Sequence, residues 1–231
     1  MTSRSLPWGK RRLQIRNFND DFLLIEAEDG ASVTQLGKQL FAAALDFVEE
    51  VIVTEKEVCL QLNERFDATN MDWLKGGGEV VAQQGKTYQL PIYFSDHEDW
   101  AGVIATTGLA KEAIITQLVS TDFSIAMFGF LPGFLYLDGL DPALHVPRKT
   151  VPAKYVKANS IAIGGRYIGL YALDSPGGWH VIGKLAIPVL QIPELPPLPV
   201  NLGDTLRFRS ITKAEYEELL AHPISLTEYN A

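Results

Sequence analysis

Residues 123–136, FSIAMFGFLPGFLY, indicate the kind of fold that the second half of the chain adopts. The stretch opens with β-prone residues, and its part 128–136 places four aromatic rings among two glycines and a proline, with neither helical nor strand periodicity. We therefore expect a strand followed by an irregular loop with aromatic walls. Further short β-rich pieces punctuated by Gly and Pro predict a barrel or a sandwich, and they lie at 160–163, 167–171 and 205–208.

Proline is distributed unevenly along the chain. Pro7 alone precedes residue 90, and the other twelve of thirteen prolines lie between Pro91 and Pro223. A glycine turn at 76–78 comes just before this change of composition. The sequence therefore predicts two domains, at residues 1–85 and 86–231.

The first domain has the pattern of an α+β fold. Its predicted elements follow the order βαββαβ, which is typical of the ferredoxin-like split βαβ arrangement. They are a strand at 22–27, a helix at 32–47, a hairpin at 50–54 and 57–62, a short helix capped by Asp67, and a strand at 79–82. The second domain is expected to begin with a strand at 87–94 and to carry helices at 110–119 and 213–220.

The charge balance excludes several classes of partner. There are 20 Lys and Arg against 28 Asp and Glu, for a net charge of −8, and no basic block. Because nucleic-acid affinity depends on cations that displace counterions, we expect no binding to nucleic acid or to anionic membranes. No apolar run approaches the roughly 18 residues of a membrane span, so a cytoplasmic protein is expected. The lone Cys59 is expected to be a buried small hydrophobe.

The familiar catalytic motifs are missing from the sequence. The histidines at 97, 145, 180 and 222 are too widely spaced for a zinc-hydrolase pair, so we expect no metal site. Residues 178–184, GWHVIGK, match part of a phosphate loop. However, Leu185 stands where a Ser or Thr must hold Mg²⁺, and the bulky β-prone residues favour a strand.

Residues 174–180, DSPGGWH, predict a tight turn that presents Ser175, Trp179 and His180. The seryl hydroxyl and the imidazole are the plausible proton-handling groups in this neighbourhood, since an unperturbed histidine titrates near pH ~6.5.

Three ordered blocks resemble one protein family. They are FGFLPGFLYL at 128–137, GLD at 139–141 with PR at 147–148, and SPGGW at 175–179 with IG at 182–183. Together they are similar to the allophanate hydrolase subunit 1 family, which includes the B subunit of 5-oxoprolinase and the Kip-type inhibitors of sensor histidine kinases. The chain departs from the family at Tyr167-Ile168, where a polar Gln-Thr pair is usual, and at Lys184, where Arg is usual.

The resemblance implies an N-terminal ferredoxin-like domain and a C-terminal cyclophilin-like β-barrel. It also implies a subunit of an ATP-dependent 5-oxoprolinase, which opens 5-oxoproline to glutamate together with C-like and A-like subunits of the same system, with ATP used at the level of the complex. Two alternatives remain: a regulatory inhibitor that binds a sensor histidine kinase, and a carboxyltransferase-type subunit that acts on a urea-derived substrate.

The predicted site lies between the 129–136 loop and the 175–180 turn. We expect Arg148 to bind the carboxylate of a small anionic substrate, because its fork offers two parallel donors. The alternative is that Arg148 pairs with an acidic side chain and pins its own loop. The catalytic candidates are Ser175 and His180, and the substrate-binding candidates are Phe130, Gly133, Phe134, Tyr136, Arg148, Gly177, Gly178, Trp179 and Lys184.

Overall fold

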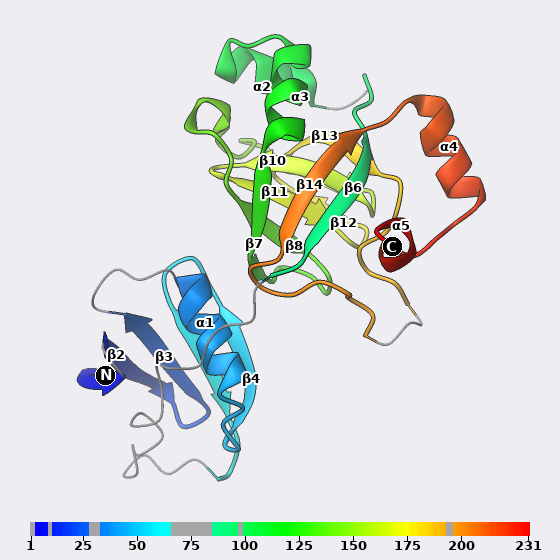
Figure 1. The fold of residues 1–231 in the computed structure, drawn as a ribbon. Helices are drawn as coiled ribbons and strands as arrows, with labels where there is room; N and C mark the ends of the chain where they lie inside the picture. The colour runs from blue at the N-terminus through cyan, green and yellow to red at the C-terminus, as the bar shows by residue number, and fades with distance from the viewer. Residues whose placement is uncertain (1–2, 9–10, 28–32, 66–84, 97–98, 193–195) are drawn as a thin grey trace. The chain divides into compact units, whose positions relative to one another are not determined.

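A computed structural model describes residues 3–8, 11–27, 33–65, 85–96, 99–192 and 196–231 (Figure 1). The chain divides into two compact units, Met1–Gln84 and Gly85–Ala231. The first holds an antiparallel sheet and the second a closed barrel, so the α+β class is confirmed.

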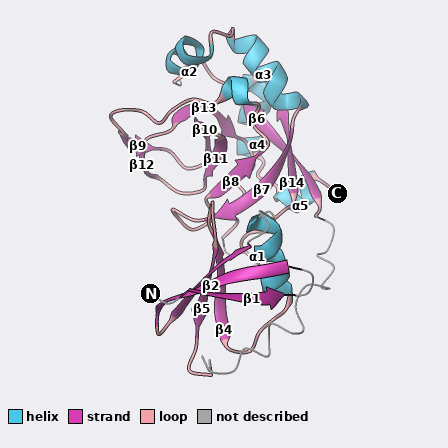
Figure 2. Cartoon of the chain, turned by 90° about the vertical axis from the view of Figure 1, so that its left-hand side faces the viewer, coloured by secondary structure: helices cyan, strands magenta, loops and turns pink. Residues whose placement is uncertain are grey.

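The first unit is an antiparallel sheet of five strands with one helix, α1 (Val33–Ala42), packed on it (Figure 2). The strand order is β1-β2-β3-β5-β4. Leu36 and Leu40 of α1 are buried, and a Cβ on Gly37 would lie 2.2 Å from Val53 Cγ2, so the helix lies close against the sheet. The strands are β1 (Ser3–Trp8), β2 (Arg11–Asn19), β3 (Phe22–Ala27), β4 (Val48–Val53) and β5 (Val58–Leu62).

The predicted strand at 22–27 and the predicted hairpin are confirmed as β3 and as the pair β4–β5. The helix is shorter than predicted: it ends at Ala42, and Ala44 adopts a φ of 44°, which no helix interior tolerates. The apolar stripe runs on to Phe47 without a stop signal, which is why the prediction overshoots. Strands β1 and β2 were missed, and the helix predicted after Asp67 and the strand at 79–82 lie outside the described residues.

Cys59 lies in β5, in register with Leu24 and Ile52, and is partly buried. Burial raises the pKa of its thiol, and Glu57 and Glu50 raise it further. With a raised pKa, little of the thiol is ionised at neutral pH. The thiol therefore reacts slowly, because the thiolate is the reactive form. We expect alkylation by iodoacetamide in the native protein to be at least tenfold slower than that of free cysteine and to accelerate on unfolding. Equal alkylation rates in the native and unfolded protein would contradict a partly buried Cys59 thiol with a raised pKa.

The second unit is a closed barrel with the strand order β10-β11-β8-β7-β14-β6-β13, so of the two predicted architectures the barrel is present. Strands β14 and β6 pair in parallel, and the other neighbouring strands of the barrel pair antiparallel. The strands are β6 (Thr87–Tyr93), β7 (Asp122–Phe128), β8 (Leu135–Asp138), β10 (Ser160–Gly164), β11 (Tyr167–Tyr171), β13 (His180–Leu185) and β14 (Thr205–Ser210).

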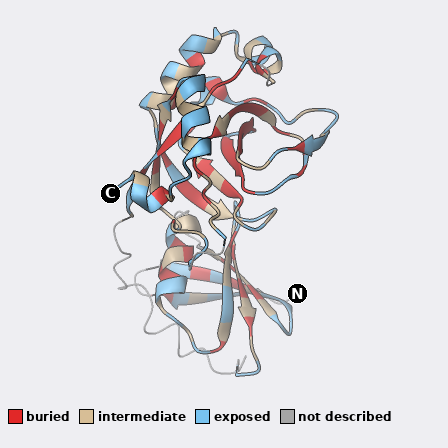
Figure 3. Cartoon of the chain, turned by 90° about the vertical axis from the view of Figure 1, so that its right-hand side faces the viewer, coloured by how far each residue is buried: buried red, intermediate tan, exposed pale blue. Residues whose placement is uncertain are grey.

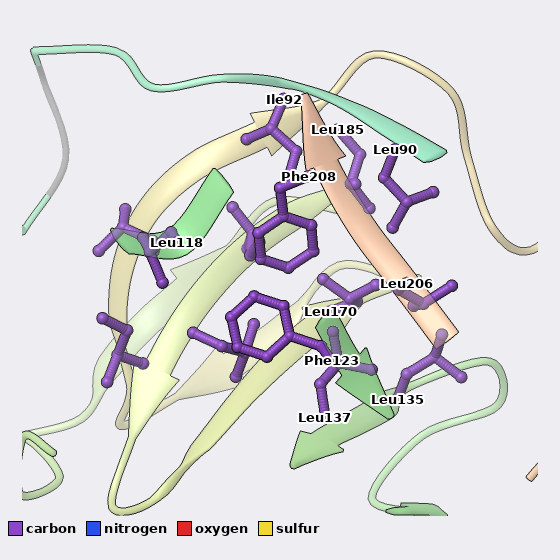
Figure 4. Packing of buried hydrophobic residues seen from close by; sticks show 14 of the residues in the cluster. Leu90, Ile92, Leu118, Phe123, Leu135, Leu137, Leu170, Leu185, Leu206 and Phe208 are labelled. Carbon is purple, nitrogen blue, oxygen red and sulfur yellow. The ribbon is translucent and has the colours of Figure 1, made fainter. Parts of the chain in front are cut away.

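Apolar side chains pack in the interior of the barrel (Figure 4), and buried residues recur along its strands (Figure 3). Phe123 and Phe208 stack near its middle with ring centroids 4.7 Å apart. Around them lie fully buried aliphatic residues contributed by several strands, such as Leu90, Leu137 and Leu170. These packed side chains occupy the interior of the barrel, which favours a site on its outside or at its ends.

Helices and a small ribbon surround the barrel. The helices predicted at 110–119 and 213–220 are present as α3 (Lys111–Ser120) and α4 (Lys213–Ala221), whereas α2 (Trp100–Thr107) and α5 (Leu226–Tyr229) were missed. A short 3-10 helix, η2 (Pro142–Leu144), follows β8, and β9 (Ala153–Val156) pairs with β12 (Ser175–Gly177) in a separate ribbon. No helix among the described residues has the length and apolar character needed to cross a membrane.

Two local predictions needed correction and one is confirmed. The irregular loop spans residues 129–134 rather than 128–136, because Phe128 ends β7 and Leu135 starts β8. The predicted turn at 174–180 is largely strand, since β12 pairs with β9 and His180 already belongs to β13. Residues 180–184 lie in β13, so the partial phosphate-loop pattern is a strand, as predicted.

Candidate functional site

Strands β10 and β11 carry apolar side chains on both faces. Ile161, Ile163, Ile168 and Leu170 belong to the core inside the barrel. Their neighbours point the other way, because side chains alternate along a strand. Five rings gather on this outer face, and we call them the outer aromatic cluster: Phe134, Tyr136, Tyr167, Tyr171 and Trp179.

The two segments that the sequence singled out meet in this cluster. The Trp179 ring lies edge-on to Phe134 at 5.9 Å and to Tyr136 at 5.6 Å between centroids. Such edge-to-face pairs each contribute about 0.5–1.5 kcal/mol beyond the area they bury. The indole lies directly on the backbone of β10 and β11 at Gly164 and Gly169, where a side chain would collide with it.

The loop between β7 and β8 presents one ring to solvent. Phe130 is 58% exposed and adopts a φ of 67°, the left-handed region that a phenylalanine rarely occupies. Its ring contacts Phe134 at 5.3 Å and Tyr171 at 6.2 Å. Gly133 also has a positive φ, and a Cβ there would lie 2.9 Å from that of Ala172. An exposed ring on strained backbone is a feature that clusters at ligand-binding sites.

Arg148 lies at the edge of the cluster. Its guanidinium carbon is 5.8 Å from the centroid of the Trp179 ring, and its side chain is exposed. It forms no ion pair within the described parts of the chain, so the alternative of an acidic partner gains no support there. The neighbouring Lys149 makes the ion pair of this loop, with Asp99.

Ser175 is not presented to solvent as predicted. It lies in β12, in register with Val156, and is 7% exposed. Its hydroxyl oxygen is buried and has no hydrogen-bond partner among the residues that the structure describes. A buried hydroxyl without a partner costs free energy and is a group to which a ligand or a water molecule can bond. Two residues on, a Cβ on Gly177 would lie 2.5 Å from the Tyr171 hydroxyl.

His180 and Lys184 both lie on β13, and each makes its own set of contacts. His180 Nε2 is 3.1 Å from the Pro147 carbonyl oxygen, and its Nδ1 is buried. Lys184 is in register with Ser160 on one side and Tyr93 on the other. The Gly178 carbonyl accepts a hydrogen bond from the Lys149 amide at 2.7 Å.

Tyr167 and Tyr171 were missed by the sequence analysis as candidate site residues. Both are buried on β11 and face the cluster, with Tyr167 edge-on to Tyr136 at 6.0 Å. The alternation of β11 could have shown that they point away from Ile168 and Leu170, although not that this face carries the site. Arg166 donates to the Tyr167 hydroxyl at 2.7 Å. Of the pair that departs from the family pattern, Tyr167 therefore belongs to the outer aromatic cluster, whereas Ile168 lies in the core inside the barrel.

A model of the carboxyltransferase domain, subdomain C and D, matches residues 13–200. The chain belongs to this carboxyltransferase-domain family. The match extends over most of both units, and it confirms the resemblance drawn from the three sequence blocks.

Two kinds of named protein are similar to this carboxyltransferase-domain chain. The B subunit of 5-oxoprolinase from Escherichia coli O157:H7 is 32% identical over 132 residues, which cover 56% of this chain and 61% of that protein. Its counterpart from Bacillus subtilis (strain 168) is 33% identical over 130 residues, or 55% and 54% of the two chains. The crystal structure of Kluyveromyces lactis urea carboxylase shares the fold, with a TM-score of 0.72 at 16% identity over 94% of this chain and 24% of that one. The matched region thus spans little more than half of the curated relatives.

The polar groups of the candidate site are mostly donors. Burial raises the pKa of Tyr136 and of Tyr171, while Arg148 opposes the rise in both, so both phenols remain protonated at neutral pH. A guanidinium and protonated hydroxyls in an apolar setting suit an anionic or carbonyl oxygen of a ligand. No group of three or more His, Cys, Asp or Glu side chains that could hold a metal ion occurs in the described ranges.

Proposed function

We propose that this chain is a subunit of an ATP-dependent 5-oxoprolinase, which converts 5-oxoproline to glutamate together with C-like and A-like subunits. The relatives named as the B subunit of 5-oxoprolinase support the reaction. The single observation that carries the site is Arg148, exposed and without an acidic partner in the described structure, held beside the outer aromatic cluster.

The chemistry of 5-oxoproline fits such a site. The molecule has one carboxylate, one lactam carbonyl and an apolar ring edge. In this proposal Arg148 binds the carboxylate through two parallel charge-assisted hydrogen bonds. The exposed Phe130 and the partly buried Tyr136 contact the ring, and Phe134 and Trp179 support them from below. Ser175, whose hydroxyl has no hydrogen-bond partner among the described residues, is proposed to bond a polar atom of the substrate or a proton-carrying water.

The proposal places ATP at the level of the complex. The segment that partly matches a phosphate loop is strand β13, so it offers no glycine-rich cradle for phosphates. We propose that the first unit is a ferredoxin-like domain and the barrel a cyclophilin-like domain, within the predicted bounds 1–85 and 86–231. A carboxyltransferase-type reaction on a urea-derived substrate is the second candidate, favoured by the carboxyltransferase-domain family to which the chain belongs.

We expect the purified chain to be inactive alone, because none of its described residues form a catalytic triad, a phosphate loop or a metal set. The test is glutamate release from 5-oxoproline with ATP, using the chain alone, the partners alone and the three proteins together. Turnover in the full mixture and not in either part supports the proposal. Full ATP-dependent turnover by the single chain, or by the partners without it, contradicts it.

A further inference from the structure

The short loop that carries Arg148 is tied to one segment on both sides of the arginine. On one side the Pro147 carbonyl oxygen lies 3.1 Å from His180 Nε2. On the other side the Lys149 amide donates to the Gly178 carbonyl at 2.7 Å. Residues 178–180 therefore hold the backbone immediately before and after Arg148.

The two nitrogens of the His180 imidazole differ: Nδ1 is buried, and Nε2 bonds to the Pro147 carbonyl. Its Nδ1 is buried without a hydrogen-bond partner in the described structure, and a Cβ on Gly102 of α2 would lie 3.0 Å from it. The carbonyl of Pro147 can only accept, so the proton is assigned to Nε2, which donates to it. In either charge state of the ring this donor is present.

A second tie fixes the Lys149 side. The Lys149 ammonium pairs with the Asp99 carboxylate, and both side chains are partly buried. Asp99 also accepts from the Val181 amide at 2.8 Å, and its own amide donates to the Val181 carbonyl at 2.8 Å. The start of α2, the loop at 147–149 and the start of β13 are thus joined by hydrogen bonds.

We propose that His180 is a positioning residue, which holds the Pro147 carbonyl so that the Arg148 guanidinium stays over the Trp179 ring in reach of a substrate carboxylate. This role differs from the proton transfer for which the sequence made His180 a candidate. The hydrogen bonds described above support this positioning role, and the identity of the substrate rests on the proposed function.

The physical reason is the entropy of a long side chain on a short loop. A free arginine loses much of its rotamer freedom when it is fixed in one geometry. Tying the backbone on both sides and seating the guanidinium over an indole removes part of that loss before the substrate binds. Without His180 the substrate must supply the ordering itself, so affinity falls while the chemical step is unaffected.

The first test needs no substrate. The Nε–Hε resonance of Arg148, identified by its absence in the Arg148→Lys variant, reports ring-current shielding by Trp179. We expect His180→Leu to move this resonance toward the position of a free arginine, and His180→Gln, which keeps a donor at Nε2, to restore it. The matched control is His145→Leu, which removes an equivalent histidine bond, 3.2 Å to the Leu140 carbonyl, and leaves Pro147 tied.

The second test uses the reconstituted complex with 5-oxoproline. We expect His180→Leu to raise KM about tenfold, the equivalent of one lost hydrogen bond, with kcat within about twofold of the unmodified complex. His180→Gln should restore KM. An unmoved Arg148 resonance in His180→Leu, or a fall in kcat that Gln does not rescue, overturns the inference. If no variant shows turnover but the resonance moves as expected, the positioning role stands and the proposed substrate is wrong.

Discussion

Arg148→Gln is expected to lower kcat/KM of the reconstituted complex for 5-oxoproline about a hundredfold or more. Two parallel charge-assisted hydrogen bonds to a carboxylate are lost, and each contributes roughly 1.5–3 kcal/mol. The melting temperature should hardly change, because Arg148 is exposed and its side chain packs on the Trp179 ring at the edge of the cluster. The measurements are steady-state kinetics and a thermal melt of the same preparation.

The matched control for Arg148→Gln is Lys154→Gln, which removes a positive charge from an exposed position on the neighbouring β9. It should leave kcat/KM within about twofold, because solvent and salt screen an exposed charge that does not bind the substrate. Unchanged turnover in Arg148→Gln, together with a lower melting temperature, would show that the arginine is structural and that the carboxylate is bound elsewhere.

Gly164→Ala is expected to destabilise the barrel unit by about 3 kcal/mol, or roughly 10 °C in melting temperature. An added Cβ would lie 2.1 Å from Trp179 Cδ2 and 2.4 Å from both Cγ and Cε2. The indole cannot retreat easily, because it also lies against Gly169 and contacts Phe134 and Tyr136. Relief requires the whole outer aromatic cluster to shift, and Arg148 over Trp179 with it.

Gly178→Ala is the control for Gly164→Ala, since its Cβ would meet Pro152 at an ordinary 3.7 Å, and we expect a melting temperature within about 2 °C of the parent. A double variant sharpens the test. Trp179→Ala removes the colliding ring, so adding Gly164→Ala to it should cost far less than in the parent chain. Additive losses would contradict the proposed collision.

The sequence predicted the site segments better than the contacts between them. The aromatic loop and the SPGGW block were expected to face each other, and the Trp179–Phe134 and Trp179–Tyr136 contacts show that they do. Whether Trp179 would be a ligand wall or a buried support could not be predicted, because that depends on Gly164 and Gly169 leaving the backbone bare beneath it. Those glycines look like ordinary turn or strand glycines in the sequence.

The freedom of Arg148 from acidic partners in the described structure was likewise beyond the sequence. Arg148 and Lys149 are adjacent cations, and either could pair with an acidic residue. The choice is made by Asp99, fifty positions before Lys149 in the chain, which pairs with that lysine. Such a long-range pairing depends on how α2 packs against β13, and no local pattern reports it.

In the first unit the missed strands have a simple cause. Strand β2 alternates apolar and polar residues, with Leu13 and Ile15 buried between more exposed polar neighbours, yet only these two aliphatic residues mark its buried face. Burial of Trp8, Leu13 and Ile15 in the completed sheet is what stabilises these strands. Tertiary packing therefore overrides a weak local signal.

The most direct test of the account is a calorimetric titration of the reconstituted complex, without ATP, using 5-oxoproline and its uncharged analogue 2-pyrrolidinone. If Arg148 and the outer aromatic cluster form the binding site, the acid should bind saturably and at least about a hundredfold more tightly than the neutral lactam, because the two charge-assisted bonds to its carboxylate are each worth about 1.5–3 kcal/mol. Equal affinity for the two compounds, or no binding of 5-oxoproline, would contradict the account.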